Sequence, residues 1–147
     1  MSVEENKALV QEFEDLINAK DLETALTLFS TDYVDHTPSI GLPPGIEGAR
    51  AFHSMQIAAF PDRRTTSLDI ISEGDKVVHR LVGECTHQGE FMGISPTGKR
   101  ITWSCIDIWR IAEGKIVEHW VEADMMSLMQ QLGVPVYAGA PRDTNSD

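Results

Sequence analysis

The feature that most constrains the fold of this chain is a change in its hydrophobic pattern near residue 65. Beyond that point apolar and polar residues alternate, which is typical of strands whose two faces meet different surroundings. Short Gly-containing turns at residues 73–75 and 112–114 separate neighbouring segments, so these segments are expected to pair as antiparallel hairpins. The four expected strands are residues 66–72, 76–86, 100–111 and 115–122.

The first 60 residues carry helical spacing instead. Apolar residues such as Leu9 and Phe13 recur at intervals of three or four, which predicts an amphipathic first helix. A short second helix is expected after Asp21, whose side chain can cap it, and a third is expected over residues 47–59. The Pro- and Gly-rich residues 37–48 are expected to form a loop that is long enough to act as a lid.

Helices followed by an antiparallel meander predict an α+β domain. A sheet this long with one apolar face is expected to curve around the N-terminal helices, which gives a cone with an internal pocket. A last helix is expected over residues 125–132, capped by Asp124 and ended by Gly133. The chain is therefore expected to be a single domain over residues 1–133, followed by a flexible tail at residues 134–147.

The composition excludes several classes of partner. The 147 residues include 12 Lys and Arg against 23 Asp and Glu, a net charge of −11, which disfavours nucleic acid and anionic membrane surfaces. The first residues do not resemble a signal peptide, and Cys85 and Cys105 are expected to be reduced thiols, so a cytoplasmic location is expected. The sequence has no phosphate-binding glycine loop, nucleophile elbow or zinc-ligand spacing, so neither a metal nor an organic cofactor is expected.

The strongest candidates for chemistry lie on the two strands that flank the turn at residues 112–114. Strand side chains alternate between faces, and one face of the 100–111 strand is large and aromatic with a single carboxylate in it. That face comprises Ile101, Trp103, Cys105, Asp107, Trp109 and Ile111. A lone Asp107 in an apolar wall is either a proton-transfer group or the partner of a polar group on a neighbouring strand, and the spacing alone favours neither.

His119 lies on the next strand, on a face that it shares with Val117 and Val121. An isolated histidine in such a wall is more often a hydrogen-bonded structural residue than a proton-transfer group. The hairpin makes Asp107 and His119 neighbours, however, and this proximity raises the weight of an acid–base role for the pair.

Other polar residues carry weaker signals. Asp35 and His36 precede the proline-rich loop, where they either reach the pocket mouth or are ordinary loop residues. An ion pair on the outer sheet face explains Arg80 as well as a pocket cation does. A hydrogen-bonded turn is the simplest explanation of His87, and a helix cap explains Asp124.

Five segments carry a resemblance to a known family: GDKVVHR (74–80), THQGEFMGISPTGKR (86–100), GKIVEHWVEAD (114–124), QQLG (130–133) and AFPD (59–62). Together they resemble the SnoaL-like polyketide cyclases, whose cone-shaped fold is that of ketosteroid isomerase and nuclear transport factor two. The resemblance implies a pocket wall with polar groups at Asp35, Cys105, Asp107 and His119. In the characterised cyclases an acid/base aspartate lies two residues after the histidine, and this chain has Val121 there. Residues 86–98 are more similar to relatives implicated in polyketide hydroxylation, which also carry that aspartate.

The resemblance implies an enzyme that acts on a small hydrophobic, polyketide-like carbonyl compound by cofactor-free acid–base chemistry, as cyclisation, isomerisation or hydroxylation. Without the usual aspartate, Asp107 and His119 have to carry the catalysis. The substrate-binding residues are then expected to be Asp35, His36, Phe60, Trp103, Cys105, Trp109 and Val121.

The main alternative is a non-catalytic binding or dimerisation module for small hydrophobic ligands. A strongly raised pKa of Asp107 in a closed pocket favours the enzyme, whereas a paired and exposed carboxylate favours the module. A hydrolase of the limonene-epoxide type, with Arg80 beside Asp107, ranks last because no third acid is obvious. Trp120 is expected on the outer sheet face, where a second copy of the chain would cover it, so a homodimer is expected.

Overall fold

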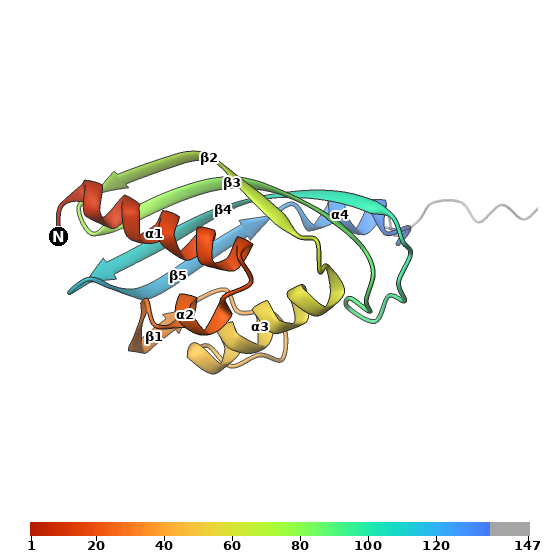
Figure 1. Cartoon of the computed structure of the whole chain (residues 1–147), viewed down its shortest axis with the longest axis horizontal. Coiled ribbons are helices and arrows are strands. Elements are labelled where there is room, and N and C mark those ends of the chain that lie inside the picture. Colours follow the sequence, from red (N-terminus) through yellow and green to blue (C-terminus); the bar gives the residue numbers. More distant parts are fainter. Residues whose placement is uncertain (136–147) are drawn as a thin grey trace, which may run out of the picture.

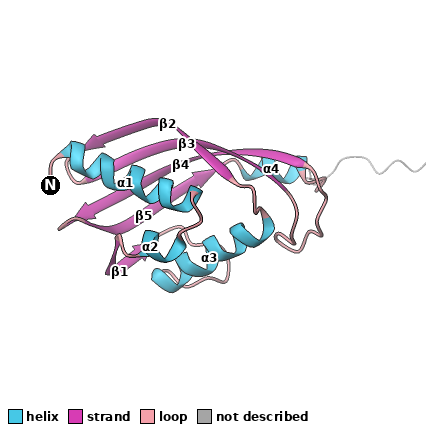
Figure 2. Cartoon of the chain, viewed as in Figure 1, coloured by secondary structure: helices cyan, strands magenta, loops and turns pink. Residues whose placement is uncertain are grey.

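The computed structural model describes residues 1–135 (Figure 1). Its elements are α1 (Val3–Asn18), α2 (Leu22–Leu26), β1 (Phe29–Asp35), α3 (Ile46–Ala59), β2 (Arg64–Glu73), β3 (Lys76–Thr86), β4 (Arg100–Ala112), β5 (Lys115–Ala123) and α4 (Met125–Gln131). Helices precede a strand meander, so the predicted α+β class is confirmed (Figure 2). The tail predicted for residues 134–147 lies outside the described residues from residue 136 onward. No helix within residues 1–135 is long and apolar enough to cross a membrane.

The five strands form one sheet in the order β1-β5-β4-β3-β2. The strands from β2 to β5 are the predicted antiparallel meander. The prediction of a wholly antiparallel sheet is wrong, because β1 pairs in parallel with β5 and makes the sheet mixed. This extra strand covers the free backbone groups along the edge of β5, which would otherwise be exposed. The sheet curves over the helices but is not closed (Figure 1).

The core consists of two clusters of buried residues on the helix-covered face of the sheet. The first cluster joins Phe13 of α1 to Val77 of β3 and Trp109 of β4. The second cluster joins Phe60, which follows α3, to Ile101 near the start of β4. β4 runs from one cluster to the other, so the middle of this strand faces the space between them.

The alternation predicted for β4 is present: Ile101, Asp107 and Trp109 are buried, whereas Ser104 and Ile106 are exposed. The alternation predicted for β5 holds only from the middle of the strand onward. A bulge shifts the register, so that Ile111 pairs with Ile116 and Arg110 pairs with Glu118. Val117 is the extra residue, and Ile116 occupies the buried position that the simple alternation assigns to the other face.

The local signals for the helix ends are confirmed. Asp21 and Asp124 cap α2 and α4 as predicted, and Ser2 forms a capping box with Glu5 at the start of α1. The proline-rich loop folds back onto the first turn of α3, where a Cβ on Gly48 would lie 1.7 Å from the carbonyl oxygen of Pro43. Only glycine permits that approach, so this contact fixes the loop against the helix.

Candidate active site

The candidate site is centred on Asp107 and His119, which lie on neighbouring strands of the concave face. β4 and β5 pair Trp109 with His119 and Asp107 with Val121, so these four side chains point to the same side of the sheet. His119 Nε2 lies 2.6 Å from Asp107 Oδ1. Both residues are buried, with Asp107 7% and His119 9% exposed. The predicted contact across the hairpin is therefore present.

Asp35 completes the surroundings of the imidazole from the opposite side. Parallel pairing of β1 with β5 places Asp35 beside His119, and Asp35 Oδ1 lies 3.5 Å from His119 Nδ1. The same carboxylate accepts a hydrogen bond from the Thr37 backbone N–H at 2.9 Å. The ring of Trp109 stacks on the imidazole, with 3.9 Å between their centroids. The imidazole is thus held between two carboxylates and against an indole.

This arrangement determines which of the groups are charged. Burial alone lowers the pKa of His119, but hydrogen bonds to Asp107 and Asp35 and the charges of both acids outweigh it and raise the pKa. Burial alone raises the pKa of Asp35, but hydrogen bonds from His119 and Thr37 outweigh it and lower the pKa. Both shifts favour the charged forms, a protonated imidazole of His119 next to an ionised Asp35.

The thiol of Cys105 lies beside the pair, with Sγ 3.6 Å from Asp107 Oδ2. Burial first, and then the Asp107 charge, raise the pKa of this thiol far above its usual value. Cys105 is therefore a neutral thiol that donates weakly to the carboxylate, and it is not a nucleophile at neutral pH.

Several buried polar atoms have no hydrogen-bond partner among residues 1–135. They include His53 Nδ1 and Gln56 Oε1 on α3, Arg63 Nε after α3, and Trp109 Nε1 on β4. His53 and Gln56 are three residues apart, so they share one face of α3. Burial first, and then the charges of Arg63 and His119, lower the pKa of His53 to about 3, so this imidazole is neutral. Unsatisfied buried polar atoms are uncommon, and such a group is consistent with a ligand site.

Comparison with known proteins now identifies the family. The chain matches the family model of SnoaL-like polyketide cyclases over residues 7–132. The chain belongs to the SnoaL-like polyketide cyclase family. Comparison with curated proteins gives no match.

Solved structures of this SnoaL-like family have the same fold. AclR of Streptomyces galilaeus, a proposed hydroxylase, is 35% identical over 90% of this chain and 98% of its own, with a TM-score of 0.82. IdmH of Streptomyces antibioticus, a proposed polyketide cyclase, is 35% identical over 88% of this chain and 99% of its own, with a TM-score of 0.76. TsrD of Streptomyces laurentii is 29% identical over 92% and 99%, with a TM-score of 0.83.

The structure brings most of the predicted site residues of this SnoaL-like chain together. Asp35, Asp107 and Trp109 each contact His119, and Cys105 contacts Asp107. The other three predicted residues that are aromatic or apolar lie further along the same face of the sheet or beside it. Trp103 lies toward the second core cluster, Phe60 lies within that cluster, and Val121 pairs with Asp107.

The structure places His36 on the outer face of the sheet and not at the expected pocket mouth. Its ring stacks on Trp120, 4.6 Å away, and its Nε2 lies 3.0 Å from the Glu118 carboxylate. Glu118 and Trp120 pair with Arg110 and Ile108 on the outer face of the sheet, so His36 belongs to that face. The next residue after β1 continues the alternation of that strand, which turns His36 away from Asp35.

Three of the residues with weaker signals, Arg80, His87 and Asp124, have structural roles. Arg80 pairs with Asp69 at 2.7 Å on the exposed outer face, so it cannot complete a triad with Asp107. His87 Nδ1 accepts a hydrogen bond from the Thr97 backbone N–H at 3.2 Å, as expected for a turn. Asp124 caps α4.

Three residues of the concave face were missed from the sequence: His53, Arg63 and His79. His79 is 1% exposed, pairs with Asp107 in the β3–β4 ladder, and lies 2.7 Å from the Ser67 hydroxyl. The alternation of β3 could have identified His79. Arg63 and His53 depend on how the end of α3 meets the sheet, and the sequence pattern does not encode this.

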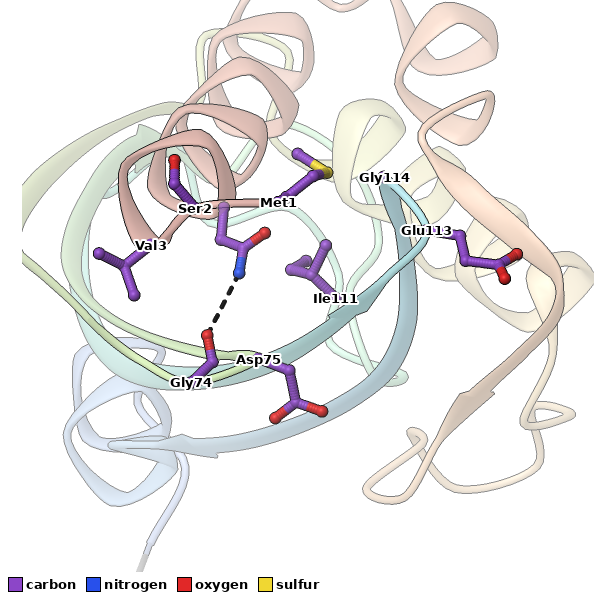
Figure 3. Close-up of a pocket in the computed structure, with 9 residues that line it drawn as sticks. Met1, Ser2, Val3, Gly74, Asp75, Ile111, Glu113 and Gly114 are labelled. Carbon is purple, nitrogen blue, oxygen red and sulfur yellow. Dashed lines mark hydrogen bonds between the residues drawn. The ribbon is translucent and has the colours of Figure 1, made fainter.

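Two surface cavities are present, and neither is lined by Asp107 or His119. One, of about 470 Å³, lies where the start of α1 meets the β2–β3 and β4–β5 turns (Figure 3). The other, of about 420 Å³, lies on the outer face beside Ile106 and Trp120. The predicted internal pocket stays a prediction. Among residues 1–135, no group of three or more His, Cys, Asp or Glu side chains is arranged to hold a metal.

Proposed function

We propose that this chain is a cofactor-free acid–base enzyme that removes a proton next to the carbonyl group of a small hydrophobic, polyketide-like substrate. The observation that carries the proposal is the imidazole of His119, held between the carboxylates of Asp107 and Asp35 on a buried face. Perturbed titratable groups that lie together in an aromatic wall are typical of proton-transfer sites.

The contacts divide the roles within this group. Both nitrogens of His119 already face carboxylates, whereas Asp107 Oδ2 has only the weak contact with Cys105. Asp107 Oδ2 is therefore the base: the substrate C–H bond breaks, a bond from this oxygen to hydrogen forms, and the electron pair moves onto the carbonyl oxygen. The unpartnered Trp109 Nε1–H donates to that developing enolate oxygen. His119 holds Asp107 in position through the contact between Nε2 and Oδ1.

The residue at position 121 supports this assignment. The usual aspartate of the family is replaced by Val121, and Val121 pairs directly with Asp107. A carboxylate on β4 thus reaches the same part of the wall that a carboxylate on β5 would reach. An enolate formed here can close a ring or shift a double bond; with dioxygen as oxidant it forms a hydroperoxide, which a two-electron reductant such as a thiol then converts to the hydroxylated product and water. AclR and IdmH are each 35% identical to the chain, so likeness alone does not separate hydroxylation from cyclisation.

The test is solvent exchange of an activated C–H bond. With 2-tetralone in D2O, the wild-type protein should accelerate deuterium uptake next to the carbonyl, followed by NMR. Asp107→Asn should reduce this acceleration about 100-fold, the usual contribution of a positioned base, and His119→Ala should also reduce it. Asp69→Asn on the outer face is the matched control and should retain full activity. Full exchange by both site variants would refute the proposal.

A non-catalytic binding module is the second candidate, because Asp107 is paired as well as buried. Burial favours the enzyme and pairing favours the module, so the environment of this residue does not decide between them. A wild-type protein that binds 2-tetralone without accelerating its exchange, with equal affinity in Asp107→Asn, would support the module.

We also propose that the outer face of the sheet pairs with a second copy of the chain. Ile71, Val82 and Ile106 are exposed there, at 62%, 37% and 45%. Charged residues of both signs lie among them, such as Arg80 and Asp69, so two copies of this face can place opposite charges against each other. Self-complementarity of this kind suits a two-fold interface.

A further inference from the structure

Arg63 is a cation on the concave side that no residue of the described chain neutralises directly. It follows α3, where its backbone N–H donates to the Phe60 carbonyl at 3.0 Å. Its guanidinium lies over the ring of Trp103, 5.3 Å from the centroid. Nε is buried without a partner, and the side chain makes no hydrogen bond or ion pair with another residue among 1–135.

This isolation is unusual within the protein. Unlike Arg63, four other arginines form ion pairs with carboxylates: Arg50, Arg80, Arg100 and Arg110. The Arg63 Nε–H is buried without an acceptor in the described chain although the residue as a whole is partly exposed, and a desolvated donor without a partner is costly. Burial lowers the pKa of Arg63, and the charges of Glu14 and other neighbours oppose that effect. Glu14 makes no ion pair with Arg63, and its carboxylate accepts a hydrogen bond from the hydroxyl of Thr65.

A second, independent observation is that three further buried polar atoms on α3 and β4 also lack hydrogen-bond partners in this part of the chain. Trp109 Nε1, His53 Nδ1 and Gln56 Oε1 are also buried and unpartnered within residues 1–135. The rings of His53 and Trp109 both pack against Phe13, with centroids 5.7 and 5.4 Å from its ring, and the charges of Arg63 and His119 both act on His53. Arg63 and the Asp107–His119 pair therefore border one region, with Trp103 and Trp109 along β4 as its aromatic wall.

We propose that Arg63 binds an anionic oxygen group, a carboxylate, of a planar aromatic substrate whose rings lie along Trp103 and Trp109. This inference rests on the proposed function and names the substrate class of the same site. Guanidinium groups bind carboxylates through two parallel hydrogen bonds, which fixes orientation as well as charge. The ionised Asp35 beside His119 repels a substrate anion, so the anion lies at the Arg63 end. The carbonyl and its acidic C–H bond are then directed toward Asp107.

The test compares an acid with its neutral ester as probes. We choose 1-hydroxy-2-naphthoate and methyl 1-hydroxy-2-naphthoate, with dissociation constants from isothermal titration calorimetry on the full chain at pH 7.5. The acid should bind about tenfold or more tightly than the ester, as one charge-assisted hydrogen-bonded pair provides. Arg63→Gln should remove this preference by weakening the acid alone. The neighbouring and exposed Arg64→Gln is the matched control and should retain it.

Further variants keep the outcome decisive. Arg63→Lys keeps the charge and should retain part of the preference even where Arg63→Gln folds poorly, which circular dichroism would detect. Equal binding of acid and ester by the wild type, a preference that survives Arg63→Gln, or no binding of the acid below 1 mM (on the order of the weakest specific affinities) would each overturn the inference. Asp107→Asn should lose deuterium exchange and keep the acid preference. Absence of exchange with an intact preference would refute only the proposed function.

Discussion

The buried imidazole of His53 predicts a specific loss of stability in acid. Burial first, and then the charges of Arg63 and His119, lower the pKa of His53 from 6.5 to about 3. The unfolded chain takes up a proton at this residue near pH 6.5, and the folded chain does not. The contribution of His53 to stability is therefore complete above pH 6.5 and is lost progressively as the pH falls toward 3.

The size of the effect follows from the two pKa values. At pH 5 the unfolded imidazole lies about 1.5 pH units below its pKa, which favours unfolding by about 2 kcal/mol at 1.36 kcal/mol per unit. A folded pKa of about 4 instead of about 3 would give nearly the same value, because pH 5 lies above both. His53 as a whole residue is only partly buried, although its Nδ1 is not exposed, which makes about 2 kcal/mol an upper limit.

The assay is urea unfolding of the wild type and His53→Gln at pH 7.5 and pH 5. The packing cost of the substitution appears at both pH values, whereas the titration affects only the wild type. The wild type should therefore lose up to about 2 kcal/mol more than the variant between the two conditions. An equal loss in both proteins, within the usual extrapolation error, would show that His53 is not held neutral in the folded state.

Three further predictions address other parts of the site. The pKa of His119 is raised in the folded protein, so the stability that this residue contributes is complete below pH 6.5 and is lost as the pH rises through the folded pKa. In urea unfolding, the wild type should therefore lose stability above neutral pH relative to His119→Gln. A Cβ on Gly83 would lie 2.0 Å from the Trp103 ring, so Gly83→Ala should displace the indole, cost about 1–3 kcal/mol of stability and alter near-ultraviolet circular dichroism; unchanged stability and spectra would contradict the contact. Trp120→Glu should convert a homodimer to a monomer in light scattering after gel filtration, and a monomeric wild type would contradict the proposed pairing.

Much of the concave wall could be predicted because two periodic signals agree there. The alternation of β4 placed Asp107 among aromatic residues, and the short turn after it placed His119 on the neighbouring strand. Both signals are local in sequence, and local signals survive folding when one face of a strand is buried. The N-terminal caps of α1, α2 and α4 were predictable for the same reason.

The remaining features depend on contacts between distant segments. β1 has only two buried residues, Phe29 and Tyr33, so its hydrophobic pattern is a weak signal for a strand. Its parallel partner lies more than 80 residues away. The bulge at Val117 has no residue signature such as glycine. Arg63 and His53 acquire their significance only because the end of α3 meets β4, and no alternation or spacing records that meeting.

The pairing of Val121 with Asp107 makes one last prediction about how this site differs from its relatives. Val121→Asp would place a second carboxylate opposite the first, with Cβ atoms about 5 Å apart. Two such charges repel by roughly 3 kcal/mol at an effective dielectric constant of 20, so one of them keeps a proton. Part of this cost is already present at pH 5, so the variant should lose about 1.5–2 kcal/mol more than the wild type as the pH rises from 5 to 8.

Moving the carboxylate separates repulsion from catalysis. The double variant Asp107→Asn/Val121→Asp has one acid at this point of the wall, so the pH-dependent loss should disappear. If proton transfer needs only a carboxylate in that region, the double variant should exchange 2-tetralone faster than Asp107→Asn alone. If the double variant exchanges no faster than Asp107→Asn, the carboxylate has to lie on β4, where Asp107 is 2.6 Å from His119. Val121 would then belong to a site whose catalytic acid has moved from β5 to β4.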